Sequence, residues 1–345
     1  MRGCGRHARG RVIRFAIVTM RHIPISAVED AASAIYAAAV RTPLVRLDVP
    51  VRTPEGEAVE VYLKLECLQP IGSFKLRGAY NAVRQLGPRD LKDGVWTVSA
   101  GNAGQGVAFA ARAVGAPCSV MVMDTAPETK VRAIERLGAT IVRATYDECW
   151  KTVETHASDR MHGYFVHPFD DDAFIAGNAT AGLEILEDLP GVSTVVAAIG
   201  GGGLLAGIAA VMSARRPDVR VVAAEPETAS PLALSLAAGS PQRFEAWRSS
   251  FVDGAGGRSV LPSMWPLLHG VISGSLVVTL DDAAAAMKLT AERNHVIIEG
   301  AAACAVAAAL SGRAGRGQVV AVVSGGNIDL TRFAALVGAC PPASA

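Results

Sequence analysis

Short apolar segments and helix-like segments alternate along most of this chain. The apolar segments are rich in valine and alanine, carry few charges and have the length of strands; they cover residues 94–100, 118–123, 139–144, 193–200, 219–225, 276–280 and 318–326. The helical patterns between them cover residues 104–115, 127–138, 147–160, 204–215, 281–294 and 301–310. This alternation is typical of parallel sheets covered by helices on both faces. The pattern predicts an α/β fold with mainly parallel sheets, and 345 residues are enough for two domains.

Charge and composition restrict the kind of partner. The formal net charge is only +1, so we expect neither nucleic acid nor a membrane surface as a partner. The six cysteines are scattered without the spacing of a metal site, which is typical of reduced thiols in a cytoplasmic protein. Residues 192–214 are uncharged, but four central glycines favour a strand, a turn and a buried helix over a membrane span.

Residues 1–19 are rich in arginine and include only a short apolar stretch. That stretch is too short for a secretory signal, and no small-residue cleavage site follows it. A transit peptide is one interpretation, and a start assigned upstream of Met20 is the other. We therefore expect residues 1–19 to be a non-native start or a disordered extension outside the fold.

The segment "IGSFKLRGAY", residues 71–80, places a lysine where a helix is expected to begin. Ser73 has the features of an N-cap, and Lys75 then falls in the first turn, where the helix dipole disfavours a cation. The charge of Arg77 should make that position still less favourable for a cation. These conditions favour a neutral, nucleophilic amine at Lys75. The alternative is a lysine whose amine reaches solvent from the helix end.

Three glycine-bearing turns follow predicted strands, at residues 99–106, 200–203 and 324–327. Ligands bind at the carboxyl ends of parallel strands, so the sequence predicts a binding site at these turns. Glycines between a strand and a helix expose backbone N–H groups to an anion such as a phosphate.

The tetraglycine turn allows two further interpretations. Gly201, Gly203 and Ala206 fit a dinucleotide-binding GxGxxA pattern, with Glu225 as the ribose-binding acid. Alternatively, the glycines serve only tight packing. A dinucleotide site gives Lys75 no role, whereas a lysine amine and a phosphate cradle together meet the needs of pyridoxal phosphate.

Segments spread over residues 25–335 make the resemblance to a known family specific. They read "RTPL" (41–44), "GSFKLRGA" (72–79), "SAGNAGQG" (99–106), "HPFDD" (167–171), "IGGGGLLAG" (199–207), "AAEPE" (223–227), "VDGAGG" (252–257) and "SGGN" (324–327). In this order they resemble the fold type II, tryptophan synthase beta-like pyridoxal-phosphate enzymes, within the serine/threonine dehydratase branch. The resemblance implies two three-layer domains, the larger from residues 20–93 plus 173–345 and the smaller, inserted one from 94–172. The cofactor would lie between them.

The resemblance also implies the residues of the site. Lys75 would bind pyridoxal 5'-phosphate covalently and act as the catalytic base. The other implied cofactor contacts are Phe74 against the ring, Asn102 at the phenolic oxygen, Gly200, Gly201, Gly202, Gly203 and Leu204 at the phosphate, and Ser324 at the ring nitrogen. The implied substrate contacts are Ser73, Ser99, Ala100, Gly101, Asn102 and Ala103.

The function implied by the resemblance is that of an ammonia-lyase in amino-acid catabolism. It would convert L-threonine, L-serine or a related β-hydroxy amino acid to a 2-oxo acid and ammonia by α,β-elimination. Relatives in this branch are commonly homodimers or homotetramers, so we expect a homo-oligomer. Outside this chemistry, the alternative is a dinucleotide-binding oxidoreductase.

Three positions depart from the pattern of that branch. Ala103 replaces a histidine; this either enlarges the pocket or only changes packing. A larger pocket would suit phenylserine, hydroxyaspartate or an intermediate of hydroxyectoine breakdown. Ala100 replaces the serine of racemases, which disfavours racemisation. Glu225 fits a cation site, divalent or monovalent, but Pro231 stands where its second acid is expected, so Glu225 is either one ligand of an incomplete site or a loop cap.

Overall fold

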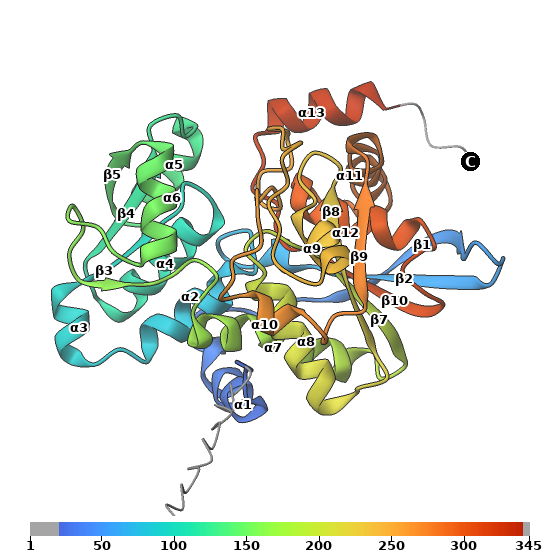
Figure 1. The fold of residues 1–345 in the computed structure, drawn as a ribbon, viewed down its shortest axis with the longest axis horizontal. Coiled ribbons are helices and arrows are strands. Elements are labelled where there is room, and N and C mark those ends of the chain that lie inside the picture. Colours follow the sequence, from blue (N-terminus) through green and yellow to red (C-terminus); the bar gives the residue numbers. More distant parts are fainter. Residues whose placement is uncertain (1–20, 341–345) are drawn as a thin grey trace, which may run out of the picture.

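The computed structural model describes residues 21–340, which form two α/β units around two separate sheets (Figure 1). The extension expected at residues 1–19 lies outside the described residues. Both sheets are mainly parallel, as the alternation of apolar and helical segments predicts.

The larger sheet has six strands. Their spatial order is β1 (Leu44–Arg52), β2 (Ala58–Lys64), β10 (Gly317–Val322), β7 (Val192–Ala198), β8 (Arg220–Pro226) and β9 (Gly274–Val278). Only the β1–β2 pair is antiparallel, and all other neighbours run parallel. The carboxyl ends of β7 and β10 therefore meet at one edge of the sheet, where two of the glycine turns follow.

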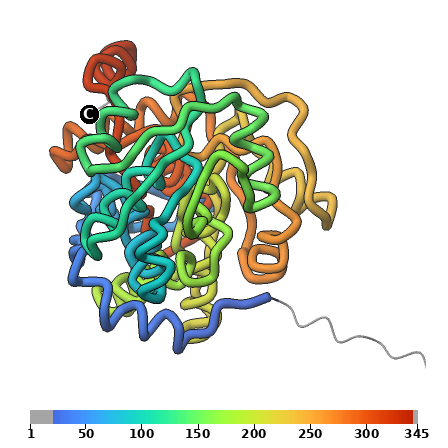
Figure 2. The backbone as a smooth tube through the Cα atoms, turned by 90° about the vertical axis from the view of Figure 1, so that its left-hand side faces the viewer, coloured from blue at the N-terminus to red at the C-terminus, as the bar shows by residue number. Residues whose placement is uncertain are grey.

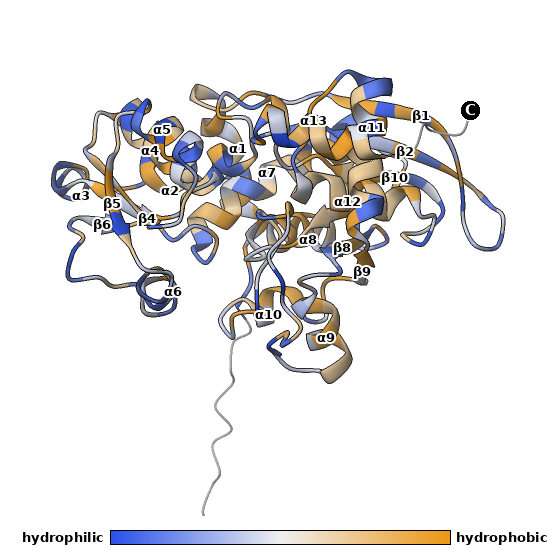
Figure 3. Cartoon of the chain, turned by 90° about the horizontal axis from the view of Figure 1, so that it is seen from above, coloured by the Kyte–Doolittle hydropathy of each residue, from blue (hydrophilic) through white to orange (hydrophobic). Residues whose placement is uncertain are grey.

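Helices cover both faces of this sheet. One face packs against α11 (Leu280–Asn294), α12 (Gly300–Leu310) and α13 (Leu330–Ala339). The other packs against α1 (Ile25–Ala34), α7 (Asp172–Asp188), α8 (Gly203–Arg215) and α10 (Trp265–Leu268). Val319 and Ala321 of β10 face the first group, and Val320 and Val322 face the second. The core helix α12 is almost entirely apolar (Figure 3).

The smaller sheet has four parallel strands. Their order is β5 (Thr140–Ala144), β4 (Cys118–Met123), β3 (Val95–Val98) and β6 (Tyr164–Phe165). One face packs against α4 (Asn102–Val114) and α5 (Glu128–Glu135), and the other against α6 (Tyr146–Thr155).

Helices that precede residue 94 also contribute to the smaller core. Helix α2 (Lys75–Arg84) places Ala79, Ala82 and Val83 in the same hydrophobic cluster as α4. The short helix α3 (Pro88–Asp93) then leads into β3. Packing of the smaller unit thus includes side chains from both sides of residue 94.

The remaining elements are α9 (Pro231–Ala238) and two 3-10 turns, η1 (Ile35–Ala37) and η2 (Glu66–Leu68). The uncharged run 192–214 folds as strand β7, a glycine turn and helix α8, as predicted. Within residues 21–340 no helix is both long enough and apolar enough to span a bilayer. The five cysteines of the described chain are all free thiols.

Candidate active site

A cavity of about 740 Å³ lies between the two units. Residues from all three predicted glycine turns line it, and so does Lys75. Figure 2, in which the smaller unit faces the viewer, shows the 240–270 region in orange running beside it. The ion pair between Lys130 of α5 and Asp253 of that region joins the two units at the cavity.

Lys75 is the first residue of α2 and lies close to two phenylalanine rings. Its Nζ donates to the carbonyl oxygen of Pro168 at 2.5 Å and lies 5.2 Å from the ring centroid of Phe74 and 5.3 Å from that of Phe174. Burial lowers the pKa of Lys75 to about 7. A large fraction of this amine is therefore neutral at physiological pH, in the form that acts as a nucleophile or a base.

Two expectations about the start of α2 were wrong. The helix begins at Lys75 with Phe74 as its N-cap residue, and the buried hydroxyl of Ser73 has no hydrogen-bond partner. Arg77 does not add to the repulsion at Lys75, because it is fully buried between the carboxylates of Glu66 and Glu184. Its Nε–Glu66 and Nη1–Glu184 distances are 2.7 and 2.6 Å. Two carboxylates so close neutralise its charge locally.

The turn between β7 and α8 presents bare backbone amides to the cavity. Within residues 21–340 no protein acceptor is found for the N–H groups of residues 200–205. Gly202 adopts φ +94°, which favours glycine, and a Cβ on Gly201 would lie 2.1 Å from the ring of Phe169. Packing thus requires these glycines, and their amides still form an anion site at the start of α8.

Gly201→Ala tests this turn. The added Cβ must displace Phe169, and such overpacking in a packed region costs about 1–3 kcal/mol. We expect the variant to bind pyridoxal phosphate about tenfold more weakly or worse, as measured by titrating the cofactor-free protein and following cofactor absorbance. Gly338→Ala is the control, since its Cβ would meet open space. Equal affinity in both variants would contradict the assignment.

The turn between β3 and α4 forms a second set of exposed amides. Ser99 Oγ accepts a hydrogen bond from the N–H of Gly101 at 3.1 Å, and α4 begins at Asn102. Of the residues that the structure describes, none accepts from the N–H groups of residues 102–104. Ser99, Ala100, Gly101, Asn102 and Ala103 all line the cavity. This helix N-terminus can hold a carboxylate.

Asn102 is held by two partners at the cavity wall. Its Nδ2 donates to Glu299 Oε1 at 2.8 Å, and its Oδ1 accepts from Asn327 Nδ2 at 2.8 Å. The second hydrogen of Nδ2 is left for a ligand oxygen. Both partners line the cavity, and neither was expected from the sequence. Glu299 precedes the apolar run 300–310, so a lone acid there was indistinguishable from a helix cap.

Glu299 is a buried carboxyl with an unusual titration. Burial, reinforced by the charge of Asp253, raises the pKa of Glu299 from its ordinary value of 4.5 to about 7. Between these values the folded chain holds a proton that the unfolded chain has released, so the free energy of unfolding falls as pH rises.

Glu299→Gln should remove this dependence while keeping an acceptor for Asn102. We expect the variant to gain stability relative to the wild type as pH rises from 4.5 to 7, in urea unfolding series at several pH values. Glu245→Gln, at a side chain that is 82% exposed, is the control. Parallel pH profiles for the wild type and Glu299→Gln would exclude a raised pKa at Glu299.

Ser324 and Phe74 are connected by a backbone hydrogen bond. The carbonyl oxygen of Ser324 accepts from the N–H of Phe74 at 3.0 Å, so the end of β10 lies beside the start of α2. Ser324, Phe74, Lys75, Gly200, Gly201, Gly202, Gly203 and Leu204 line the same cavity. Ser73 is the one proposed contact that is absent from its lining.

Glu225 lies outside the cavity lining and caps a helix. Its carboxylate accepts from the N–H groups of Leu232 and Ala233, both at 2.8 Å, and from Ser275 Oγ at 2.6 Å. With three donors it caps α9, whose first residue is Pro231. Within residues 21–340 this arrangement leaves neither the free acid required by a dinucleotide site nor a second acid beside Glu225 for a cation.

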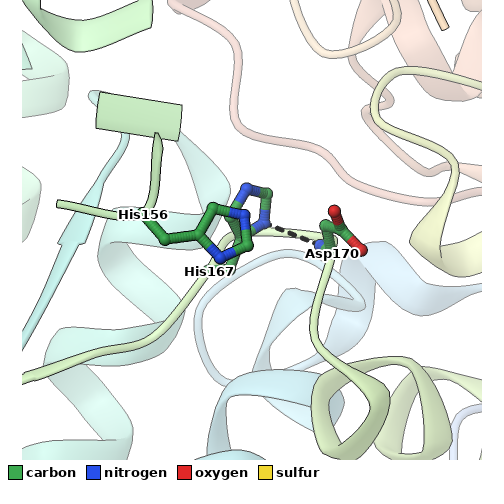
Figure 4. Close-up of side chains that lie close together, drawn as sticks. All are labelled: His156, His167 and Asp170. Carbon is green, nitrogen blue, oxygen red and sulfur yellow. Dashed lines mark hydrogen bonds between the residues drawn. The ribbon is translucent and has the colours of Figure 1, made fainter. Parts of the chain in front are cut away.

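A cluster of His156, His167 and Asp170 has the composition of a metal site (Figure 4). However, His167 Nδ1 accepts from the N–H of Asp170 at 2.7 Å, and its Nε2 lies 3.2 Å from the carbonyl oxygen of Val153. Asp170 is paired with Arg21. Burial lowers the pKa of His167 to about 4, so the ring stays neutral. These bonds hold the 167–171 segment, whose Pro168 carbonyl contacts Lys75.

The chemistry of these groups fits pyridoxal phosphate. A phosphate matches the unpaired amides at the start of α8, and the aldehyde matches the neutral amine of Lys75. Phe74 offers a ring face, and Asn102 and Ser324 offer polar groups along the same cavity.

Comparisons with known proteins agree with this chemistry. Residues 35–325 match the family model described as pyridoxal-phosphate dependent enzyme. The chain is 37% identical to L-threonine ammonia-lyase of Thermotoga maritima, over 79% of this chain and 68% of that protein. It is 38% identical to human serine racemase, over 79% and 82% of the two chains. Threonine deaminase isoform 2 of Solanum lycopersicum superposes with a TM-score of 0.79 at 28% identity, covering 95% of this chain and 99% of that one.

Proposed function

Because the chain belongs to the family of pyridoxal-phosphate dependent enzymes, we propose that it is an ammonia-lyase acting on a β-hydroxy-α-amino acid. The reaction eliminates water across the Cα–Cβ bond, and a water molecule then hydrolyses the resulting enamine to a 2-oxo acid and ammonia. One observation carries the proposal: a lysine amine with a pKa near 7 shares a cavity with two helix N-termini whose amides are unpaired.

The described residues supply the contacts that the cofactor needs. The amides of residues 200–204 would hold its phosphate, Lys75 would hold its aldehyde carbon, and Asn102 and Ser324 would bind the two polar ring positions. When bound, pyridoxal phosphate supplies an electron sink that makes the α-proton of an amino acid removable.

The protein's own groups then have defined tasks. The amides of residues 102–104 bind the α-carboxylate and orient the Cα–H bond toward Lys75. Lys75 Nζ accepts the α-proton, a task suited to an amine whose pKa is close to neutral. The carbonyl of Pro168 and the rings of Phe74 and Phe174 fix the position of that amine.

Release of ammonia and 2-oxo acid from a substrate panel tests the proposal. The panel contains L-serine, L-threonine, both 3-hydroxyaspartates and both phenylserines, with cofactor-saturated protein. Release of ammonia and 2-oxo acid from any panel member by the wild type, but not by Lys75→Ala, supports the proposal. The absence of release from every panel member contradicts it. A preference for the larger members would indicate that Ala103 widens the pocket.

Racemisation is the second candidate, because human serine racemase is among the similar proteins. A racemase needs a proton donor on the face opposite the lysine, and Ala100, which lines the cavity at the expected position, has no exchangeable proton. Formation of D-serine from L-serine at a rate comparable to ammonia release would reverse this preference.

The assembly and location of the protein form part of the same proposal. By resemblance to its branch we propose a homodimer or homotetramer in the cytoplasm. Light scattering of the purified protein tests the assembly, and a monomeric mass would contradict it.

A further inference from the structure

An arginine from outside the matched motifs lies in the wall of the cavity. Arg258 follows the "VDGAGG" segment and lines the same cavity as Lys75. The hydrogen bond from the N–H of Phe244 to the carbonyl oxygen of Arg258, 2.8 Å long, and the bridge between Arg243 and Ser259 fix its backbone. Arg258 is therefore presented from an anchored segment.

The guanidinium of Arg258 lies over the faces of two aromatic rings. Its central carbon lies 4.2 Å from the ring centroid of Trp247 and 5.1 Å from that of Tyr146. Trp247 is itself held by a hydrogen bond of 2.8 Å from Nε1 to the carbonyl oxygen of Gly256. Tyr146 begins α6 of the smaller unit, so the stack joins the two units across the cavity.

This stacked guanidinium has no anionic partner within residues 21–340. Its Nε is buried without a hydrogen bond, although most buried arginine donors are paired. Stacking on ring faces leaves the edge of a guanidinium, which carries its donors, free for a planar acceptor such as a carboxylate. The side chain is held in place while its donors stay unused.

Cationic side chains also outnumber acidic ones in the lining of the cavity. The cationic side chains are Lys75, Lys130, Arg248, Arg258 and Arg332, and the acidic ones are Asp253 and Glu299. Lys130 is paired with Asp253. Neither the phosphate nor the α-carboxylate needs a guanidinium, because helix N-terminal amides are available for both. A serine or threonine side chain would leave Arg258 unpaired.

We propose that the substrate is a β-hydroxy-α-amino acid with a second carboxylate in its side chain, and that Arg258 binds this carboxylate. This inference rests on the proposed function and names its substrate class. Trp247 and Tyr146 are positioning residues, since they orient the guanidinium by stacking.

Ligand binding tests the inference without depending on turnover. L-Aspartate, L-glutamate and L-2-aminoadipate are each compared with the corresponding amide, L-asparagine, L-glutamine or L-homoglutamine, on the cofactor-saturated protein, by calorimetry. The three acids cover different distances from the α-carboxylate. We expect at least one acid to bind about tenfold to a hundredfold more tightly than its amide.

Variants assign that preference to Arg258. Arg258→Met keeps the aliphatic stem and should bring the ratio of acid to amide affinity close to one, whereas Arg258→Lys should retain part of it. Arg243→Met is the control, because Arg243 lies in the same segment but outside the cavity lining. A ratio near one in the wild type, or an unchanged ratio in a folded Arg258→Met protein, would overturn the inference.

The substrate panel separates the two proposals. Turnover of threonine without any preference for acidic ligands would keep the ammonia-lyase and reject the Arg258 site. A preference for acidic ligands without 2-oxo acid release from any panel member would keep the Arg258 site and reject the lyase. We expect both signals, with a 3-hydroxyaspartate turned over more efficiently than threonine.

Discussion

Lys75→Ala should lower the turnover of any β-hydroxy amino acid by roughly 10³-fold or more. The substitution removes the one amine in the cavity whose pKa is near 7, and with it both the covalent anchor for the cofactor and the base for the α-proton. Ammonia release under saturating substrate and cofactor measures the effect. Lys92→Ala, at an exposed lysine of α3, should retain full activity.

The chemical identity of Lys75 can be checked without turnover. Borohydride reduction of the cofactor-loaded wild type, followed by peptide mass spectrometry, should place the phosphopyridoxyl group on the peptide that contains Lys75. Full activity in Lys75→Ala, or labelling at another lysine, would reject the assignment of Lys75 as the cofactor-binding residue.

Arg77→Met should lower the free energy of unfolding by about 3–5 kcal/mol. Arg77 is 0% exposed, and its removal leaves the carboxylates of Glu66 and Glu184 buried with one counter-charge fewer. Lys64, also fully buried, contacts Glu184 at 2.6 Å and cannot neutralise both acids. The shift in the midpoint of urea unfolding measures the loss.

The comparison for Arg77→Met is an exposed ion pair. Arg143 pairs with Glu128 at the surface, where its side chain is 40% exposed, so Arg143→Met should cost no more than about 1 kcal/mol. Similar losses of unfolding free energy in the two variants would show that the buried ion pairs of Arg77 stabilise the fold no more than a surface ion pair does.

The buried network should also make the protein sensitive to acid. Burial alone would raise the pKa of Glu66, but the charge and hydrogen bonds of Arg77 lower it overall. The unfolded chain therefore takes up a proton at higher pH than the folded chain does. The stability from Glu66 is present above the unfolded pKa and is lost as pH falls through the folded one.

Regular elements with periodic or uniform composition were predictable from the sequence. Strands β4, β7 and β8 and helices α8, α11 and α12 begin and end within two residues of the predicted ranges. Their residues are β-branched runs between turns, or helical patterns with clear ends, so local preferences and tertiary burial favour the same structure.

Other elements had no such signal. Helix α7 is buried along most of its length between neighbouring helices, and an apolar helix without a polar face shows no 3.6-residue pattern. Strand β1 is an edge strand that includes Pro50, a residue that argues against a central strand. Only packing against the rest of the fold determines these two elements.

The sequence by itself determined the fold class, the place of Lys75 in a first helical turn and the amides of the glycine turns, whereas the lowered pKa of Lys75 comes from burial in the fold. Each depends on residues adjacent in the chain: a lysine in a first helical turn, or glycines between a strand and a helix. Tertiary structure decided which charges are neutralised and which remain free. Arg77 lies two residues after Lys75 in sequence but is paired with Glu66 and Glu184, whereas Arg258 and Glu299 reach the cavity from distant segments. Charge interactions depend on distance and burial in space, and local sequence specifies neither.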